Sequence, residues 1–277
     1  MKQGRVSQTA LKVAHNLVTL SAKDDWGQRL PVDLAEMSER LLQASGQPGF
    51  GPRMMRVSKG PWMIRAYGLQ DFLMPGQFEG FGYRKIFVQD QVEAAIEQGA
   101  RQVLFAGAGF DTLCLRLAPQ YPNVKFIEFD HPATSAAKAK GIALEGQPTN
   151  MIQIAADLGE HPLSKVLSSD SRWDTSLPSV LVAEGLLQYL TDEEVRGLLV
   201  EAAACTSSGS RFVFTHAKPG YRKLVTFLTG LVAEPWKSAV ESQDLPEYVE
   251  GTGWKIISDV DTDEAHGVER YAVAERC

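Results

Sequence analysis

From residue 100 onward, the sequence alternates between short apolar runs and longer runs with helical spacing. Apolar runs of this length are typical of strands that are buried on both faces. Strands that alternate with helices form a parallel, doubly wound sheet, and such a sheet binds ligands at the carboxyl ends of its strands. Five strands of this kind are predicted: QVLFAG (102–107), VKFIEFD (124–130), MIQIAAD (151–157), SVLVAEG (179–185) and SRFVFTHA (210–217).

The first part of the chain has a different pattern, in which Gly/Pro-rich breaks separate helical runs. We therefore divide the chain into an N-terminal helical cap with a covering helix (1–98) and an α/β core (99–277). Residues from about 217 to 250 of the core are predicted to form an insertion that covers the substrate. The cap segments are predicted as helices at 9–22, 32–44 and 85–99, the last ending at Gly99, and as loops at 45–53 and 74–82.

Within the core, the helical and C-terminal segments complete the predicted sheet. The runs 254–260 and 269–275 alternate between apolar and polar residues and could pair in an antiparallel manner. A helix over 131–141 is predicted to stop at Gly141. A capping box predicts a further helix that begins after Thr191. The core is thus predicted to be mostly parallel, with an antiparallel C-terminal strand.

Composition excludes several classes of protein. A net charge of −6 argues against a nucleic-acid binder and against a membrane-surface binder. The three cysteines are odd in number and form no CxxC pair, so we expect no disulfide framework, no metal site and a reducing compartment. No apolar segment is long enough to span a membrane. We therefore expect a cytoplasmic protein that acts on a small molecule, and the sequence is compatible with a homodimer.

The turn after the first strand carries the most specific signal for a ligand. Gly107, Ala108 and Gly109 follow the strand directly, but Thr112 replaces the third glycine of the dinucleotide motif and Asp111 would repel a pyrophosphate. S-adenosylmethionine has no phosphate and carries a sulfonium and an α-amino group, so it suits a carboxylate here. The alternatives are a tight turn without a ligand and an Asp that only compensates the helix N-terminus. A nicotinamide-dependent oxidoreductase is disfavoured.

Acidic residues also stand at the ends of the other predicted strands. Asp130 follows the glycine turn at about the distance expected of an acid that binds ribose hydroxyls. Glu128, two residues earlier, is either a second ligand or the partner of a buried base. Asp157 could accept from the adenine amine while Leu158 covers the ring, although a plain turn Asp is an equal alternative. With Glu184 after the fourth strand, these acids outline one crevice.

Three of these motifs, in this order, resemble the leucine carboxyl methyltransferase family: GAGFDTLCLRL, FIEFDHPATSAAK and VAEGLLQYLTDEE. The resemblance covers about residues 80 to 215 and is greatest to the bacterial branch, which is described as O-methyltransferases of secondary metabolism. It implies a class I S-adenosylmethionine-dependent methyltransferase with a Rossmann-like core beneath a helical cap. It does not carry a substrate over to this chain.

The resemblance also implies roles for individual residues. An arginine in the helix before the first strand holds the cofactor carboxylate in that family, and Arg84 stands there, where bidentate binding is chemically sensible. Lys85 and Leu113 depart from the family pattern. Tyr189 occupies the family's aromatic position near the methyl donor. The other implied cofactor contacts are Gly107, Asp130, Asp157-Leu158 and Glu184.

The predicted function is methyl transfer from S-adenosylmethionine to a carboxylate or hydroxyl oxygen of a small molecule. A carboxylate needs no base, whereas a hydroxyl benefits from one. His216, at the end of the fifth strand, is the candidate base, with a structural role as its alternative. Tyr189 is the second candidate catalytic residue. The competing functions are a protein C-terminal carboxyl methyltransferase and a protein of this fold that transfers no methyl group.

Overall fold

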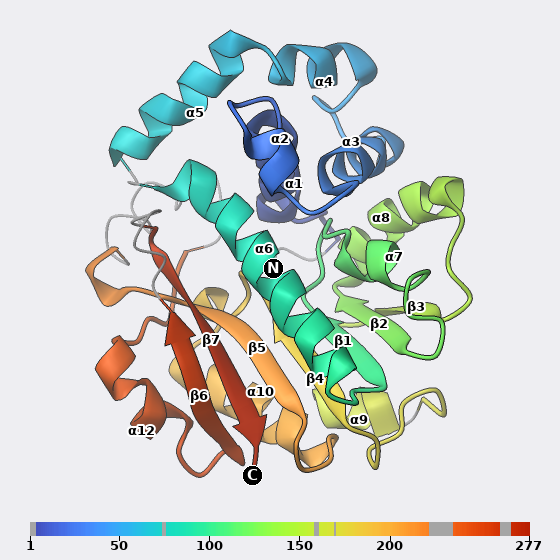
Figure 1. The fold of residues 1–277 in the computed structure, drawn as a ribbon, viewed down its shortest axis with the longest axis vertical. Helices are drawn as coiled ribbons and strands as arrows, with labels where there is room; N and C mark the ends of the chain where they lie inside the picture. Colours follow the sequence, from blue (N-terminus) through green and yellow to red (C-terminus); the bar gives the residue numbers. More distant parts are fainter. Residues whose placement is uncertain (1–3, 74–75, 158–160, 169, 222–234, 261–266) are drawn as a thin grey trace.

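The computed structural model describes residues 4–73, 76–157, 161–168, 170–221, 235–260 and 267–277 (Figure 1). One seven-stranded sheet, in the order β3-β2-β1-β4-β5-β7-β6, organises these residues. The first five strands are parallel, and β7 is antiparallel to both of its neighbours. The strands are β1 (Gln102–Ala106), β2 (Lys125–Asp130), β3 (Met151–Ala155), β4 (Ser179–Ala183), β5 (Arg211–Ala217), β6 (Trp254–Val260) and β7 (Glu269–Arg276).

Helices cover both faces of the sheet, because successive strand residues point to opposite sides. In β1, Val103 and Phe105 belong to one buried cluster, whereas Leu104 belongs to the other. The first cluster is shared with α6 (Gln77–Glu97), α7 (Leu113–Leu117) and α8 (Pro132–Glu145). The second is shared with α9 (Leu163–Ser168), α10 (Asp192–Ala204) and α12 (Leu245–Val249).

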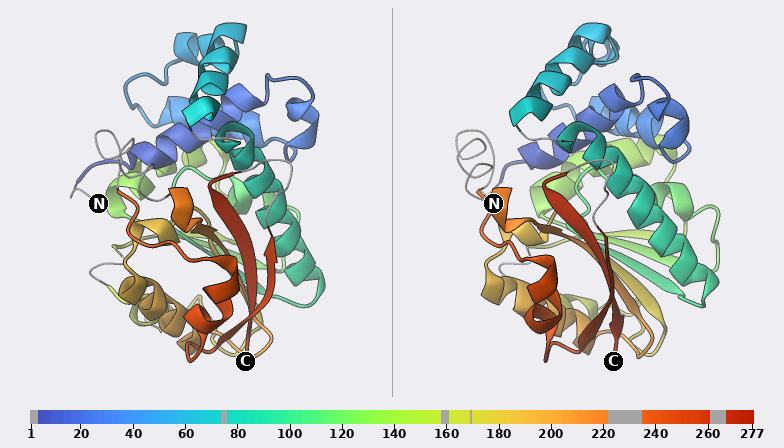
Figure 2. Two further views of the ribbon diagram at one scale, coloured as in Figure 1. Left: turned by 90° about the vertical axis from the view of Figure 1, so that its left-hand side faces the viewer. Right: turned by 60° about the vertical axis from the view of Figure 1, so that its left-hand side comes forward.

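The cap lies over the edge of the sheet at which the parallel strands end (Figures 1 and 2). Its first helix packs on α3, α6, α4 and α5, and α3 packs in turn on α8 of the core. The long helix α6 runs down from the cap along one face of the sheet (Figure 2). The cap helices are α1 (Gln8–Leu20), α2 (Trp26–Arg29), α3 (Leu34–Ala44), α4 (Pro52–Ser58) and α5 (Pro61–Leu73).

The fold class predicted from the sequence is confirmed. All five predicted parallel strands form, and the two C-terminal runs pair in an antiparallel manner. The capping box of α10 is present, with Thr191 and Glu194 bonded to each other's backbone. Gly99 follows the end of α6 with a φ of 113°. The division of the chain near residue 98 stays a prediction, and residues 222–234 of the predicted insertion lie outside the described residues.

The loop predicted at 74–82 is wrong over most of its length, because α6 begins at Gln77. The glycines of this segment suggested a loop, but Gly82 has a packing role inside the helix. A Cβ atom at Gly82 would lie 2.4 Å from the Trp26 ring, so only glycine lets the helix approach this side chain. Phe78, one turn earlier, is buried in the same cap cluster as Trp26.

The predicted end of a helix at Gly141 is also wrong, because α8 continues to Glu145. A Cβ atom at Gly141 would lie 2.9 Å from the Cα of Leu41, so the glycine allows α8 and α3 to pack closely. The helix ends instead before Gly146, which has a φ of 84°. The same residue type therefore ends one segment and permits close packing in another.

Three further observations concern the described residues. Cys114 and Cys205 are buried thiols, Cys277 is exposed, and none is in a disulfide. No group of three or more His, Cys, Asp or Glu side chains is placed to hold a metal ion in the described segments. Among the helices of those segments, none combines the length and the apolarity that crossing a bilayer requires.

Candidate active site

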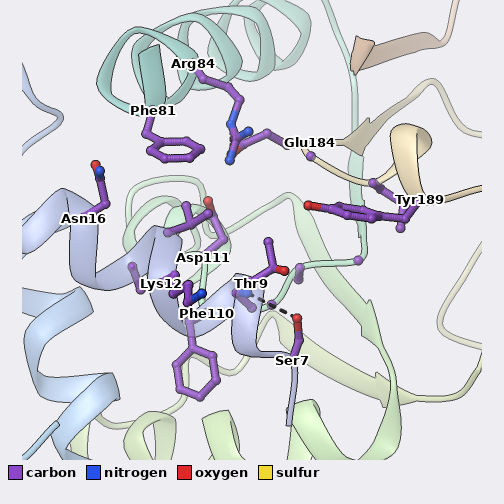
Figure 3. A pocket seen from close by; sticks show the side chains of 18 of the residues that line it. Ser7, Thr9, Lys12, Asn16, Phe81, Arg84, Phe110, Asp111, Glu184 and Tyr189 are labelled. Carbon is purple, nitrogen blue, oxygen red and sulfur yellow. Dashed lines mark hydrogen bonds and ion pairs between the residues drawn. The ribbon is translucent and has the colours of Figure 1, made fainter. Parts of the chain in front are cut away.

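A cavity of about 750 Å³ lies between the cap and the carboxyl ends of the parallel strands (Figure 3). The loops that follow β1, β2, β3 and β4 form its floor, and side chains of α1, α3, α5 and α6 line it from the cap side. Trp236, Lys237 and Glu269 also contribute to the lining. Every site residue predicted from the sequence and described by the structure lines this cavity, except His216. Leu158 lies outside the described residues.

The glycine turn adopts backbone conformations that favour glycine. Gly107 and Gly109 have φ values of 68° and 51°. A Cβ atom on Gly109 would lie 2.9 Å from the Cβ of Ala10, so the turn also lets α1 approach the sheet. The N–H of Asp111 donates to the carbonyl of Ala108 at 2.8 Å, which closes the turn. The turn therefore presents backbone directly to the cavity.

Asp130 supports this turn and also faces the cavity. Its carboxylate accepts from the N–H of Gly109 and, at 2.6 Å, from the N–H of His131. Burial raises the pKa of Asp130, although the two N–H donors oppose the shift. Asp157 lies nearby, with one carboxylate oxygen 3.7 Å from Nε2 of His131. The two acids predicted for ribose and adenine thus share one side of the cavity.

Five charged side chains form a buried group at the other side of the cavity, which we call the charge cluster: Arg84, Lys85, Asp111, Glu184 and Glu269. Nε of Arg84 lies 2.7 Å from Glu184, and its Nη1 lies 2.6 Å from Glu269. Lys85 contacts both Asp111 and Glu184. No side chain of the cluster is more than 10% exposed. Three acids against two bases leave the cluster with one net negative charge.

Ionisation within the charge cluster reflects burial and mutual attraction. Burial opposes the charge on Arg84, but Glu269 and Glu184 outweigh it and raise the pKa of the guanidinium. Burial also opposes the charge on Asp111, but Lys85 and Lys138 lower its pKa below the ordinary value. Within the described part of the chain, Oε2 of Glu184 is buried without a hydrogen-bond partner. The cluster can therefore accept a further cation or hydrogen-bond donor.

Glu128 proves to be a partner of a buried base and does not line the cavity. Its Oε2 lies 2.7 Å from Nζ of Lys138, and these side chains are 3% and 1% exposed. Burial raises the pKa of Glu128 even beside this lysine. Of the two roles left open for Glu128, the ion pair is the one that the structure contains.

The two candidate catalytic residues lie in different places. Tyr189 lines the cavity from the short helix η1 (Leu187–Tyr189), and burial raises the pKa of its hydroxyl. Figure 3 shows its ring across the cavity from Phe81. His216 is absent from the residues that line the cavity, and its Nε2 lies 3.0 Å from Asp259 on β6. The structure therefore supports the structural alternative for His216, because the ring is tied to an edge strand away from the other site residues.

Sequence reasoning missed the contribution of α1. Thr9, Lys12 and Asn16 project from this helix toward the cavity (Figure 3). Their spacing of three and four residues places polar side chains on one helical face, which was the available signal. Two half-buried side chains of the cap, His15 and Tyr67, also line the cavity. Nothing in the local sequence distinguished them from residues that pack the cap.

A family model described as leucine carboxyl methyltransferase matches residues 35–203. A relative from Parafrankia sp. is 30% identical over 179 residues, which are 62% of this chain and 56% of that protein. A relative from Streptomyces coelicolor is 31% identical over 177 residues, which are 62% of this chain and 61% of that protein. Both are provisionally named S-adenosyl-L-methionine-dependent methyltransferases. The match to this chain thus spans about three fifths of the length of each relative.

Solved structures share the fold at low sequence identity. A DUF574 family protein from Streptomyces avermitilis has a TM-score of 0.63 at 16% identity, covering 87% of this chain and 97% of that one. A protein from Thermobifida fusca that is provisionally named a methyltransferase has a TM-score of 0.62 at 18% identity, covering 86% of this chain and 94% of that one. Magnesium protoporphyrin IX methyltransferase from Synechocystis, solved with bound S-adenosylhomocysteine, has a TM-score of 0.52 at 13% identity, covering 88% and 96%.

Proposed function

The chain belongs to the leucine carboxyl methyltransferase family and has the fold of class I S-adenosylmethionine-dependent methyltransferases, and from this premise we propose that it transfers a methyl group from S-adenosylmethionine to an oxygen of a small molecule. The size of the cavity, about 750 Å³, and its position between the cap and the strand ends support a small acceptor. The assignment to secondary metabolism, a cytoplasmic location and a homodimer stay predictions from the sequence.

The observation that carries this proposal is the charge cluster beside the glycine turn. The methionine end of S-adenosylmethionine bears a sulfonium, an ammonium and a carboxylate, which sum to one positive charge. The cluster bears one net negative charge and a buried Glu184 oxygen without a partner among the described residues. A dinucleotide pyrophosphate would add negative charge to this site, so the electrostatics disfavour nicotinamide cofactors.

The residues of the cavity fit the parts of this cofactor. Asp130 would accept from the ribose hydroxyls, because each carboxylate oxygen retains acceptor capacity beyond its backbone bond. Asp157 would accept from the adenine amine. Glu184 and Asp111 would face the ammonium and the sulfonium, and the guanidinium of Arg84 would donate to the carboxylate. When bound, the cofactor supplies an activated methyl group on a sulfonium that leaves as a neutral thioether.

The protein's own contribution is alignment, electrostatics and exclusion of water. The cavity walls of α1, α5 and α6 would hold the acceptor against the methyl group. Tyr189 would lie beside that group, as the family resemblance implies, and its raised pKa keeps the phenol neutral. His216 has no part in this scheme, because it does not reach the cavity.

Replacement of Asp130 tests the proposed cofactor site. Asp130→Ala is expected to weaken the binding of S-adenosylhomocysteine about 10-fold or more, because hydrogen bonds to a charged group contribute about 1.5–3 kcal/mol. Isothermal titration calorimetry measures the effect. Asp130→Asn, which keeps one acceptor oxygen, is expected to lose less affinity for S-adenosylhomocysteine than Asp130→Ala.

The matched control is Asp25→Ala, at an exposed helix start where the side chain makes no capping bond. This variant is expected to bind S-adenosylhomocysteine with the same affinity as wild type. A folded Asp130→Ala protein with an unchanged dissociation constant would remove Asp130 from the cofactor site.

A further inference from the structure

A chain of hydrogen bonds connects the cavity to the interior of the cap. Nδ1 of His15, on α1, lies 2.9 Å from the hydroxyl of Tyr67, on α5. Nε2 of the same ring lies 2.5 Å from Oγ of Ser58, the last residue of α4. His15 and Tyr67 line the cavity, whereas Ser58 is fully buried. Three cap helices thus meet at one imidazole ring on the cavity wall.

The donors and acceptors of this chain follow from counting its hydrogens. Ser58 has one hydroxyl hydrogen and donates it to the carbonyl of Met54 at 2.9 Å. Its oxygen must therefore accept from Nε2–H of His15. In the neutral ring Nδ1 then carries no hydrogen and accepts from the hydroxyl of Tyr67. Because that hydroxyl hydrogen points to His15, the lone pairs of the Tyr67 oxygen remain to accept a hydrogen bond from the cavity.

Aromatic neighbours hold both rings of this chain in place. The ring of Tyr67 stacks on Phe78, with centroids 4.9 Å apart and an interplanar angle of 8°. The ring of His15 meets Phe50 edge to face at 5.8 Å. Such contacts restrict ring rotation and fix the direction of the hydrogen bonds. The arrangement has the orientation that a proton relay requires: a base, a bridging hydroxyl and a group that sets the tautomer.

The ionisation of the two rings suits this arrangement. Burial lowers the pKa of His15 and raises the pKa of Tyr67 to about 12. The charged groups on the packed elements include Lys12, one turn earlier on α1, and Glu39 of α3, which pairs at 2.5 Å with Lys59, the residue after Ser58. Burial is the cause of the His15 shift, so the ring is neutral at physiological pH and able to accept a proton.

We propose that Tyr67 and His15 form a proton relay that activates a hydroxyl acceptor, a phenol or an alcohol, at the cap side of the cavity. The proposal rests on the proposed methyl transfer and specifies its acceptor. The acceptor hydroxyl gives its proton to the Tyr67 oxygen while the proton of Tyr67 passes to Nδ1 of His15. The acceptor oxygen keeps the bonding pair and uses it to bind the methyl carbon, and the sulfur keeps the pair of the broken bond. The imidazolium then returns its proton to solvent.

A carboxylate acceptor would not use this relay. A carboxylate is ionised at neutral pH and needs no base, and it would repel the lone pairs that Tyr67 turns to the cavity. A hydroxyl donates to those lone pairs, whereas its methyl ether cannot. The relay therefore also distinguishes the acceptor from its methylated product, and it favours product release.

The test uses the full-length protein with S-adenosylhomocysteine and two probes, phenol and anisole, whose binding is measured by calorimetry. Wild type is expected to bind phenol about 3- to 10-fold more tightly than anisole, the range of one net hydrogen bond. Tyr67→Phe keeps the ring stack and is expected to remove this preference. Tyr248→Phe, which deletes a hydroxyl bonded to Asp192 away from the cavity, is the matched control and is expected to keep it.

Nitrogen NMR of labelled histidine supplies a second readout that needs no substrate. Wild-type His15 is expected to be the Nε2–H tautomer, and Ser58→Ala is expected to shift the population toward Nδ1–H because Nε2–H loses its acceptor. Equal binding of phenol and anisole to wild type, no binding of phenol, or an Nδ1–H tautomer in wild type would each overturn the relay. Failure of S-adenosylhomocysteine to bind would contradict the proposed function instead, and the NMR result would still decide the hydrogen-bond chain.

Discussion

Replacement of Lys138 by methionine is expected to lower the free energy of unfolding by about 3–5 kcal/mol, because it leaves the charge of Glu128 buried without its partner. Both side chains are almost fully buried between β2 and α8, and they form a direct ion pair at 2.7 Å. Oε1 of Glu128 already has no hydrogen-bond partner within the described residues. Urea unfolding followed by circular dichroism measures the change.

The decrease in the free energy of unfolding caused by Lys138→Met should grow as pH rises. Burial raises the pKa of Glu128 in the folded protein, and removal of Lys138 raises it further, whereas the unfolded value stays at about 4.3. Between these two values the folded state binds more protons than the unfolded state, so stability falls as pH rises. We therefore expect a small difference from wild type at or below the unfolded value and the full difference above the raised folded value.

A double variant separates the buried charge from packing. Glu128→Leu combined with Lys138→Met removes both charges and is expected to recover most of the lost stability, because a buried ion pair and an apolar pair of similar volume are often equivalent. A double variant that is as unstable as Lys138→Met alone would show that lost packing, and not the unpaired carboxylate, destabilises the single variant.

Arg84→Ala is expected to destabilise the protein by about 3–5 kcal/mol and to weaken cofactor binding about 10- to 100-fold. The guanidinium is the direct partner of both Glu184 and Glu269, so its removal leaves excess negative charge in a buried site. Arg84→Lys keeps the positive charge but loses the planar fork. We therefore expect this variant to keep most of the wild-type free energy of unfolding and a smaller part of the wild-type affinity for the cofactor. Urea unfolding and calorimetry with S-adenosylmethionine measure the two effects separately.

A double cycle with decarboxylated S-adenosylmethionine tests whether Arg84 holds the cofactor carboxylate. Wild type is expected to bind this analogue poorly, and Arg84→Ala should bind the analogue and the whole cofactor with similar affinity. The coupling between the two changes carries the information, since either change alone could act indirectly. If the two losses simply add, Arg84 acts only within the charge cluster, and Lys85 or Lys12 becomes the candidate for the carboxylate.

The core of the fold could be predicted because its signals are local. Continuous apolar runs define the buried strands, and the acids that end them share one edge of the sheet as a consequence of parallel topology. Glycine misled the prediction at Gly82 and Gly141, because its missing Cβ serves turns and close helix packing alike. The distinction depends on Trp26 and Leu41, which lie far away in the sequence.

The candidate site was harder to predict where the side chains that contact one another come from segments far apart in the sequence. Glu269, which completes the charge cluster, stands 185 residues after Arg84 and carries no motif. His216 has the sequence position of a strand-end base, yet its ring is bonded to Asp259 of the edge strand β6. Tyr67 and His15 come from cap helices whose relative placement is set by tertiary packing.

The central claim is that this cavity binds S-adenosylmethionine, and calorimetric titration of the full-length protein tests it most directly. S-adenosylmethionine and S-adenosylhomocysteine are expected to bind with dissociation constants near the micromolar range, or about −8 kcal/mol. NAD, titrated under the same conditions, is expected to give no measurable heat, because its pyrophosphate would meet Asp111 and the negative charge cluster. Binding of NAD without binding of either S-adenosyl compound would contradict the claim.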